Sequence, residues 1–219
     1  MKFNNLIAAL HDQAWFDLPT LRLLFPSETI QTLRTSLHRF MKEGNLIGIR
    51  RGLYCFGDSY GKKTLHGPLI ANLCYSPSYL SERWALSWYG IILEQTVLYT
   101  SVTTRPTRIF RNRWGEFRYR TIRRSQLSGF IREDIQGFSV LIAEPEQALL
   151  DLWYLEGEEW TVDRMASWRF DVEPIRDDRL AALNQENPCA RPGDRARLER
   201  VIQAWIKYRT SLEKGGRSK

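Results

Sequence analysis

Residues 27–56 read SETIQTLRTSLHRFMKEGNLIGIRRGLYCF, and this stretch predicts one helix followed by a two-stranded ribbon. Ser27 suits the helix N-cap, and Lys42 favours the negative end of the helix dipole. Gly44 supplies the left-handed residue that ends a helix. Arg50 and Arg51 then lie beside the turn of the ribbon. We therefore expect a helix and an arginine-tipped hairpin to be adjacent.

The predicted helix has two unlike faces. Apolar residues recur at helical spacing and should turn inward, namely Ile30, Leu33, Leu37, Phe40 and Met41. The outer side is left with Gln31, Arg34, Thr35, His38, Arg39 and Lys42. This outer side carries no carboxylate, so it can approach phosphate groups without repulsion.

The residues upstream complete a small module. Asn5–His11 and Leu18–Leu24 predict two short helices, and Pro26 closes the second. Three helices and a hairpin within about 60 residues predict a winged helix-turn-helix DNA-binding domain over residues 1–60. In such a domain the third helix enters the major groove of DNA.

The residue types divide the expected DNA contacts into two kinds. Gln31 and Arg34 carry donors and acceptors that can read base edges. The remaining cations should contact phosphates or reach toward the adjacent minor groove, which fixes the register, and they are Arg39, Lys42, Arg50 and Arg51. The predicted DNA-binding surface comprises Gln31, Arg34, Thr35, His38, Arg39, Lys42, Arg50 and Arg51. The alternatives are a charged face that only keeps the domain soluble and a face that contacts protein.

Composition is typical of a protein that binds a polyanion. The 219 residues carry a net charge of +7, and residues 1–63, with 9 basic and 5 acidic side chains, account for +4 of it. The chain shows neither an apolar stretch of bilayer length nor a leader pattern, so we expect a cytoplasmic protein without a membrane partner. Three widely spaced cysteines, Cys55, Cys74 and Cys189, suggest neither disulfides nor a zinc site.

The remainder of the chain predicts a second domain. Residues 57–68 read as a linker because they contain three glycines and a proline. Residues 61–219 are then expected to form a mixed α/β domain with a C-terminal helical segment, which makes the fold class α+β. Its expected elements are a helix over Ser81–Tyr89, strands over Thr96–Val102, Ile109–Trp114, Phe117–Arg123 and Phe138–Ile142, and a helix from Ala143 through Trp153.

The hairpin of this domain is strongly basic. Residues 105–124 contain eight arginines and one acid, Glu116. Its basic surface is expected to comprise Arg108, Arg111, Arg113, Arg118, Arg120, Arg123 and Arg124. Such a row suits nucleic acid or an acidic protein equally well, and charge on an edge hairpin also prevents aggregation.

Three sequence pieces in order carry a family resemblance. They are Arg51-Gly-Leu-Tyr54 at the end of the first module, Tyr79-Leu-Ser81 leading into Ala85-Leu-Ser-Trp-Tyr-Gly90, and Ile142-Ala-Glu-Pro-Glu-Gln-Ala-Leu-Leu-Asp151. Together they resemble the AbiEi family of antitoxins from bacterial abortive-infection toxin–antitoxin systems. The match covers residues 5–155, and both helical pieces look like packing motifs rather than binding residues.

The resemblance implies a function with two parts. A member of this family represses its own operon by binding operator repeats, and it opposes a cognate nucleotidyltransferase toxin encoded nearby. A homodimer or cooperative monomers on double-stranded DNA would suit repeated sites. A stand-alone regulator without a toxin is the alternative.

Catalysis is the competing class of function. The three histidines lie in unrelated contexts, and no phosphate loop or nucleophile elbow is present. An acidic patch of Glu156, Glu158, Glu159 and Asp163 could hold magnesium, although such clusters usually form solvated loops. Asp151 lies in an apolar helix, where a carboxylate is more often a structural acceptor. We therefore expect neither an enzyme nor a cofactor.

One further helix is expected near the C-terminus. Asp194 is its predicted cap, and its apolar stripe consists of Leu198, Val201, Ile202, Trp205 and Tyr208. This stripe should dock on the second domain, and a helix–helix dimer contact is the alternative.

Overall fold

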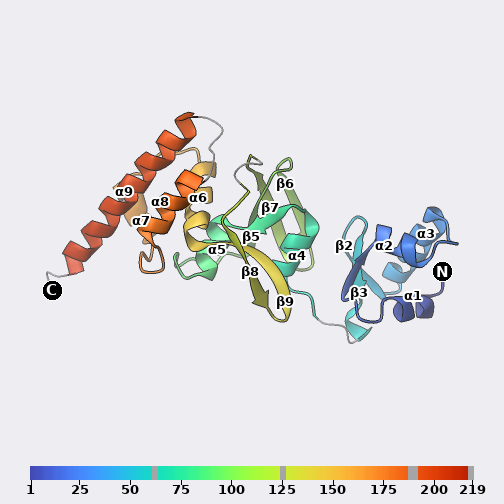
Figure 1. Cartoon of the computed structure of the whole chain (residues 1–219). Helices are drawn as coiled ribbons and strands as arrows, with labels where there is room; N and C mark the ends of the chain where they lie inside the picture. The colour runs from blue at the N-terminus through green and yellow to red at the C-terminus, as the bar shows by residue number, and fades with distance from the viewer. Residues whose placement is uncertain (61–63, 124–126, 187–191, 217–219) are drawn as a thin grey trace. The chain divides into compact units, whose positions relative to one another are not determined.

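The computed structural model describes residues 1–60, 64–123, 127–186 and 192–216 (Figure 1). The chain divides into two compact units, Met1–His66 and Gly67–Lys219, which we describe separately. Both units contain helices and a β-sheet, so the fold is mixed α+β. This division lies within residues 57–68, the segment predicted as a linker. The second unit begins at Gly67, which is the first residue of helix α4.

The amino-terminal unit is built from three helices and a three-stranded sheet. In chain order its elements are α1 (Phe3–Ala9), β1 (Trp15–Asp17), α2 (Leu18–Leu24), α3 (Ile30–Lys42), β2 (Leu46–Arg50), β3 (Leu53–Phe56) and the short 3₁₀ helix η1 (Asp58–Tyr60). The sheet order is β1-β3-β2, with antiparallel pairing throughout. Leucine and phenylalanine side chains from all three helices and the sheet form one core.

Local chemistry explains how this unit's elements begin and turn. The Asp17 carboxylate caps α2 by accepting a hydrogen bond from the backbone N–H of Thr20 at 2.9 Å. The turn between β2 and β3 contains Gly52 at φ +82°, a backbone conformation that residues with a Cβ rarely adopt. A bulge between Gly48 and Arg50 shifts the register just before this turn.

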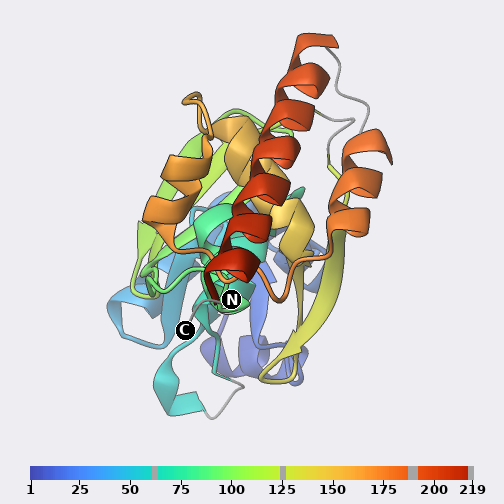
Figure 2. The same cartoon turned by 90° about the vertical axis from the view of Figure 1, so that its left-hand side faces the viewer.

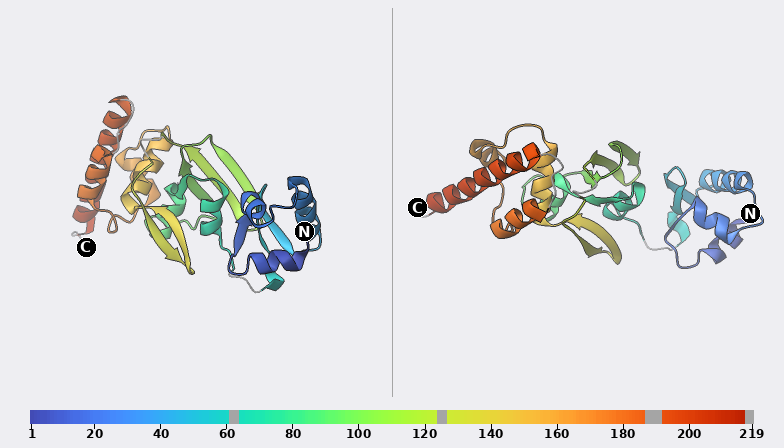
Figure 3. Two further views of the ribbon diagram at one scale, coloured as in Figure 1. Left: turned by 45° about the vertical axis from the view of Figure 1, so that its right-hand side comes forward. Right: turned by 45° about the horizontal axis from the view of Figure 1, so that its top comes forward.

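The carboxy-terminal unit contains a six-stranded mixed sheet. Its strands are β4 (Ser78–Leu80), β5 (Leu98–Thr103), β6 (Arg108–Asn112), β7 (Gly115–Thr121), β8 (Phe130–Ile135) and β9 (Phe138–Ala143), in the spatial order β6-β7-β5-β4-β9-β8. β8 and β9 form an antiparallel hairpin at one edge of the sheet (Figure 3). β4 and β8 were not predicted, because β4 is very short and β8 alternates poorly between apolar and polar residues.

Helices cover both faces of this sheet. α4 (Gly67–Cys74) packs on one face, where the Tyr119 hydroxyl of β7 donates a hydrogen bond to the Ala71 carbonyl. α5 (Glu82–Trp88) and α6 (Pro145–Leu155) pack on the opposite face, where the Tyr79 hydroxyl donates to the Asp151 carboxylate of α6 at 3.0 Å. Successive side chains of a strand point to opposite faces, and this alternation gives both layers an apolar surface to cover.

Three more helices complete this unit beside α6. They are α7 (Val162–Trp168), α8 (Asp177–Glu186) and α9 (Pro192–Gly216), and α9 runs along the other two (Figure 2). The stripe predicted on α9 is buried, with Trp205 packed 5.7 Å from the Trp153 ring of α6. Because the chain's own helices cover this stripe, it cannot also form the helix–helix dimer contact that the sequence left open.

Two further expectations concern the whole chain. Among the helices in the described ranges, none has the length and apolar character that crossing a membrane requires. Cys55 and Cys74 are buried, and Cys189 lies outside the described residues.

Candidate nucleic-acid interface

Helix α3 separates an apolar face from a polar one. It runs from Ile30 to Lys42, and the Thr29 hydroxyl caps it by accepting from the backbone N–H of Thr32 at 3.1 Å. The cap is therefore Thr29, and the prediction of Ser27 was wrong by two residues because Ser27 lies in the preceding turn. Leu33, Leu37 and Phe40 are buried as predicted.

The two ends of the predicted apolar face differ from expectation. Ile30 is 39% exposed because it occupies the first turn of the helix, beyond the core, and Met41 is only partly buried. Ser36, which the sequence did not place inward, is buried instead. The core is thus covered by a narrower stripe, centred on Leu33, Leu37 and Phe40.

All the helix residues predicted to face outward are exposed. They are Gln31, Arg34, Thr35, His38, Arg39 and Lys42. At 100° per residue, five of these positions lie on the side opposite the buried stripe, and Arg34 lies to one side of it. The Thr35 hydroxyl donates to the Gln31 carbonyl of its own helix at 3.0 Å, so its hydroxyl hydrogen is already in use.

Arg39 has partners that the sequence reasoning overlooked. Its guanidinium lies 5.0 Å from the centre of the Phe40 ring, and its Nε is 3.8 Å from a Glu43 carboxylate oxygen. Glu43 is the C-cap residue, one position beyond the helix. The expected absence of acid therefore holds for the helix itself but not for its C-cap, and Arg39 is the least available of the predicted contacts.

The β2–β3 turn brings a second set of cations to the same side of the unit. Arg34 of α3 and the turn residues Arg50 and Arg51 line one hollow of about 510 Å³. Arg50 donates to the Arg51 carbonyl at 2.9 Å, which orients its side chain along the turn. Arg34 lies at least 16 positions away from these residues in sequence, so only folding brings the three guanidinium groups together.

The charge in this hollow is predominantly positive. Within the described residues, no ion pair forms at Arg34, Arg50 or Arg51. The Asp17 carboxylate also lines the hollow, but one of its oxygens accepts from both the backbone N–H and the hydroxyl of Thr20. Three guanidinium groups without a carboxylate partner form a site that suits an anionic ligand.

The second predicted basic surface is less uniform than its sequence suggests. Arg108, Arg111, Arg113, Arg118 and Arg123 lie on β6, β7 and the turns beside them, whereas Arg124 lies outside the described residues. The expected alternation is present, since Phe117 and Tyr119 are buried and Arg118 is exposed. Glu116 neutralises part of this charge, because its carboxylate lies 2.7 Å from Arg111 and 3.6 Å from Arg118.

Arg120 does not belong to this surface, and its assignment there was wrong. Its side chain is 28% exposed, and its guanidinium donates to the buried Glu82 carboxylate at 2.6 Å and to the Leu155 carbonyl. Contacts at the start of α5 and the end of α6 hold this side chain, so it lies at the edge of a surface hollow and not in the exposed arginine row. The sequence alternation placed Arg120 on the correct face but could not show these contacts.

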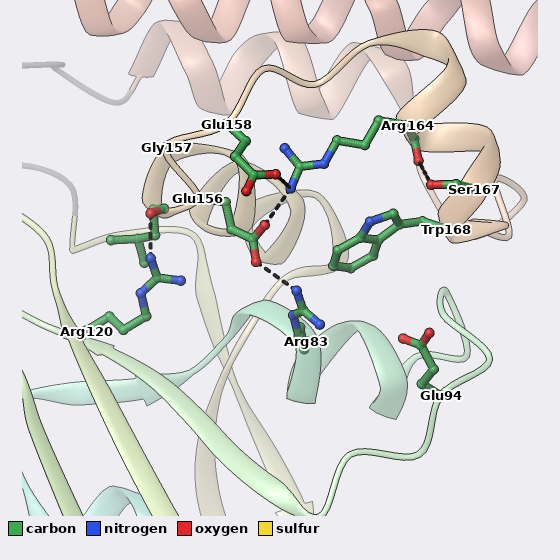
Figure 4. Close-up of a pocket in the computed structure, with 10 residues that line it drawn as sticks. Arg83, Glu94, Arg120, Glu156, Gly157, Glu158, Arg164, Ser167 and Trp168 are labelled. Atoms are coloured by element: carbon green, nitrogen blue, oxygen red, sulfur yellow. Dashed lines mark hydrogen bonds and ion pairs between the residues drawn. The ribbon is translucent and has the colours of Figure 1, made fainter.

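Two carboxylates of the acidic patch considered for magnesium, Glu156 and Glu158, pair with arginines. Arg83 and Arg164 contact the two carboxylate oxygens of Glu156 at 2.9 and 2.8 Å (Figure 4). Arg164 also lies 3.0 Å from Glu158. The described ranges contain no group of three His, Cys, Asp or Glu side chains placed to hold a metal ion. Carboxylates paired in this way serve as partners for arginines.

Two buried carboxylates form the strongest electrostatic feature of this unit. Asp151 accepts hydrogen bonds from Ser81, Tyr79 and Gln147 at 2.6, 3.0 and 2.8 Å. Burial raises its pKa to about 7, although these hydrogen bonds oppose the change. Burial likewise raises the pKa of Glu82 to about 7, against the opposing charge of Arg120. The sequence reasoning identified Asp151 as an acceptor but missed Glu82.

Comparison with known proteins adds no identification. No protein-family model matches the chain, and no curated protein shows significant similarity to it.

Proposed function

We propose that the amino-terminal unit is a winged helix-turn-helix that binds double-stranded DNA, and that the protein is a transcriptional repressor of its own operon. The element order of this unit supports the proposal, since helices α2 and α3 are followed by the antiparallel pair β2 and β3, the order expected of a winged helix-turn-helix. The observation that carries it is the hollow lined by Arg34, Arg50 and Arg51, three cations without a carboxylate partner.

The exposed residues of α3 have distinct roles in this proposal. Gln31 and Arg34 contact base edges in the major groove, where their paired hydrogen-bonding groups discriminate between bases. Lys42, Arg50 and Arg51 bind phosphates and set the register. Arg39 contributes less, because Glu43 and the Phe40 ring already hold it.

The binding of labelled DNA from the protein's own upstream region tests this proposal, with a shuffled sequence for comparison. Arg34→Ala should reduce discrimination between the two DNAs by about 1 to 3 kcal/mol, the range of a bidentate guanine contact. Lys42→Ala should weaken both equally and reduce the salt slope by about 1.

Arg132→Ala is the matched control, because it removes the same charge from an exposed position on β8 of the other unit. Equal losses on both DNAs for Arg34→Ala would remove the base-reading assignment. No binding to either DNA at low salt would overturn the proposal as a whole.

The resemblance to AbiEi antitoxins supports a second part of the proposal, namely that the protein counters a nucleotidyltransferase toxin encoded nearby. Such a repressor acts in the cytoplasm, on operator repeats, as a dimer or as cooperating monomers. Co-expression with the product of the adjacent gene tests this part. Rescue of growth from a toxic nucleotidyltransferase supports the antitoxin role, and the absence of a nucleotidyltransferase gene favours a stand-alone regulator.

A further inference from the structure

The carboxy-terminal unit contains a polar hollow of about 750 Å³ that DNA binding does not use (Figure 4). Three arginines from three separate elements line it, namely Arg83 of α5, Arg120 of β7 and Arg164 of α7. Glu156, directly after α6, lies between two of them. The hollow has the size of sites that hold small molecules.

Each arginine in the hollow is held in place by two kinds of contact. Arg83 bonds to Glu156 and lies 4.5 Å from the centre of the Trp168 ring. Arg164 bonds to the same carboxylate and lies 4.1 Å from the centre of the Trp160 ring. Side chains held in this way lose little conformational entropy when they bind a ligand.

Arg83 and Arg120 keep guanidinium N–H groups that these contacts do not use. The hydrogen bond to Glu156 uses only Nη2 of Arg83, so Nε and Nη1 have no acceptor among the described residues. Arg120 donates through Nη1 and Nη2, and its Nε likewise has no acceptor among the described residues. Guanidinium N–H groups in a fixed plane match the oxygens of a phosphate or carboxylate.

Glu156 shows which ligand chemistry the hollow accepts. Its two oxygens bind two different guanidinium groups, as the oxygens of a phosphate would. Glu156 is only 19% exposed and therefore occupies part of this anion site itself. A ligand phosphate would use the donors that Glu156 leaves free, and it would bind better without the competing negative charge.

We propose that this hollow binds a phosphate-bearing small molecule of nucleotide size, with the phosphate held by Arg83 and Arg120. Glu158, which is 81% exposed at the opening, is placed to accept hydrogen bonds from hydroxyl or amino groups of such a ligand. This binding is separate from the proposed DNA-binding role, because every lining residue belongs to the carboxy-terminal unit.

Isothermal titration calorimetry in phosphate-free buffer tests the proposal on the full chain, with ATP, AMP and inorganic phosphate as probes. We expect at least one probe to bind the wild type. Arg83→Gln should weaken that binding about tenfold, the loss expected for one charged hydrogen bond. Glu156→Gln should strengthen it, because a neutral amide replaces the competing carboxylate.

Arg105→Gln is the matched control, since this arginine stacks on Tyr75 outside the hollow and should leave binding unchanged. Circular dichroism checks that each variant is folded, and Arg83→Lys replaces Arg83→Gln if the latter is not. Equal binding by Arg83→Gln and Arg105→Gln would overturn the proposal. So would the absence of binding by both the wild type and Glu156→Gln at millimolar concentrations of every probe.

Discussion

Replacing Asp151 with asparagine should make the protein more stable at pH 8 while leaving its fold intact. Asp151 is buried and accepts through both oxygens, with Ser81 and Tyr79 on Oδ2 and Gln147 on Oδ1. An asparagine oxygen can replace Oδ2. Its amide can then donate to Oε1 of Gln147, an atom without a partner among the described residues, once the Gln147 amide rotates by 180°.

The expected magnitude follows from the pKa of Asp151. Burial raises that pKa from 3.8 to about 7 in the folded state, so at intermediate pH the folded protein holds a proton that the unfolded chain has released. The stability that Asp151 contributes is therefore fully present below pH 4 and is lost as the pH rises through about 7. A difference of about 3 between the two pKa values corresponds to about 4 kcal/mol over the whole window, and to roughly 3 kcal/mol between pH 5 and 8.

Urea unfolding of the full chain, followed by tryptophan fluorescence at pH 5, 6, 7 and 8, measures this dependence. Seven of the eight tryptophans lie in the carboxy-terminal unit, so the signal reports mainly on the correct unit. The unfolding free energy of Asp151→Asn should depend less steeply on pH than that of the wild type. The dependence that remains should come from Glu82, whose pKa is also about 7.

Asp151→Leu serves as the comparison, because it leaves three buried donors unpaired and should cost several kcal/mol at every pH. If wild-type stability increased between pH 5 and 7, the sign of the argument would be wrong. An unchanged slope in Asp151→Asn would also refute the reasoning.

Three further changes test other parts of the structure. Thr29→Ala should lower the unfolding free energy by about 1 kcal/mol in urea titrations, whereas Ser27→Ala should have no effect. A larger loss for Ser27→Ala than for Thr29→Ala would show that Ser27 caps α3. Gly52→Ala should cost about 1 kcal/mol in thermal unfolding from backbone strain alone, since nothing lies within 4 Å of the added Cβ; an unchanged melting temperature would contradict this. Arg120→Met should destabilise by about 3 to 5 kcal/mol because it leaves Glu82 buried without its cation, and Glu82→Gln added to it should recover part of the loss if the ion pair is the cause.

Features that depend on neighbouring residues could be predicted from the sequence. The periodicity of Leu33, Leu37 and Phe40 predicted α3 and its exposed side. The alternation of Phe117 with Arg118 predicted β7. These predictions succeeded because helix and strand periods act over a few residues, where the order of side chains decides which of them can be buried together.

The candidate sites needed contacts between distant parts of the chain. Arg34 meets Arg50 and Arg51 only because β2 and β3 fold back beside α3. Arg120 and its partner Glu82 lie 38 positions apart, and no local pattern distinguishes Arg120 from the exposed Arg118. Arg83 and Arg164 also come from separate helices, and only folding brings both to Glu156.

Sequence alone was therefore sufficient for the identity of most elements, for the mixed α+β class and for the residues that form the outer face of α3. Tertiary structure decided which charges remain available to a ligand. The availability of a guanidinium group depends on the carboxylates and carbonyl oxygens that folding places within about 3 Å of it. Those distances arise from the packing of whole helices on a sheet, and local periodicity carries no information about them.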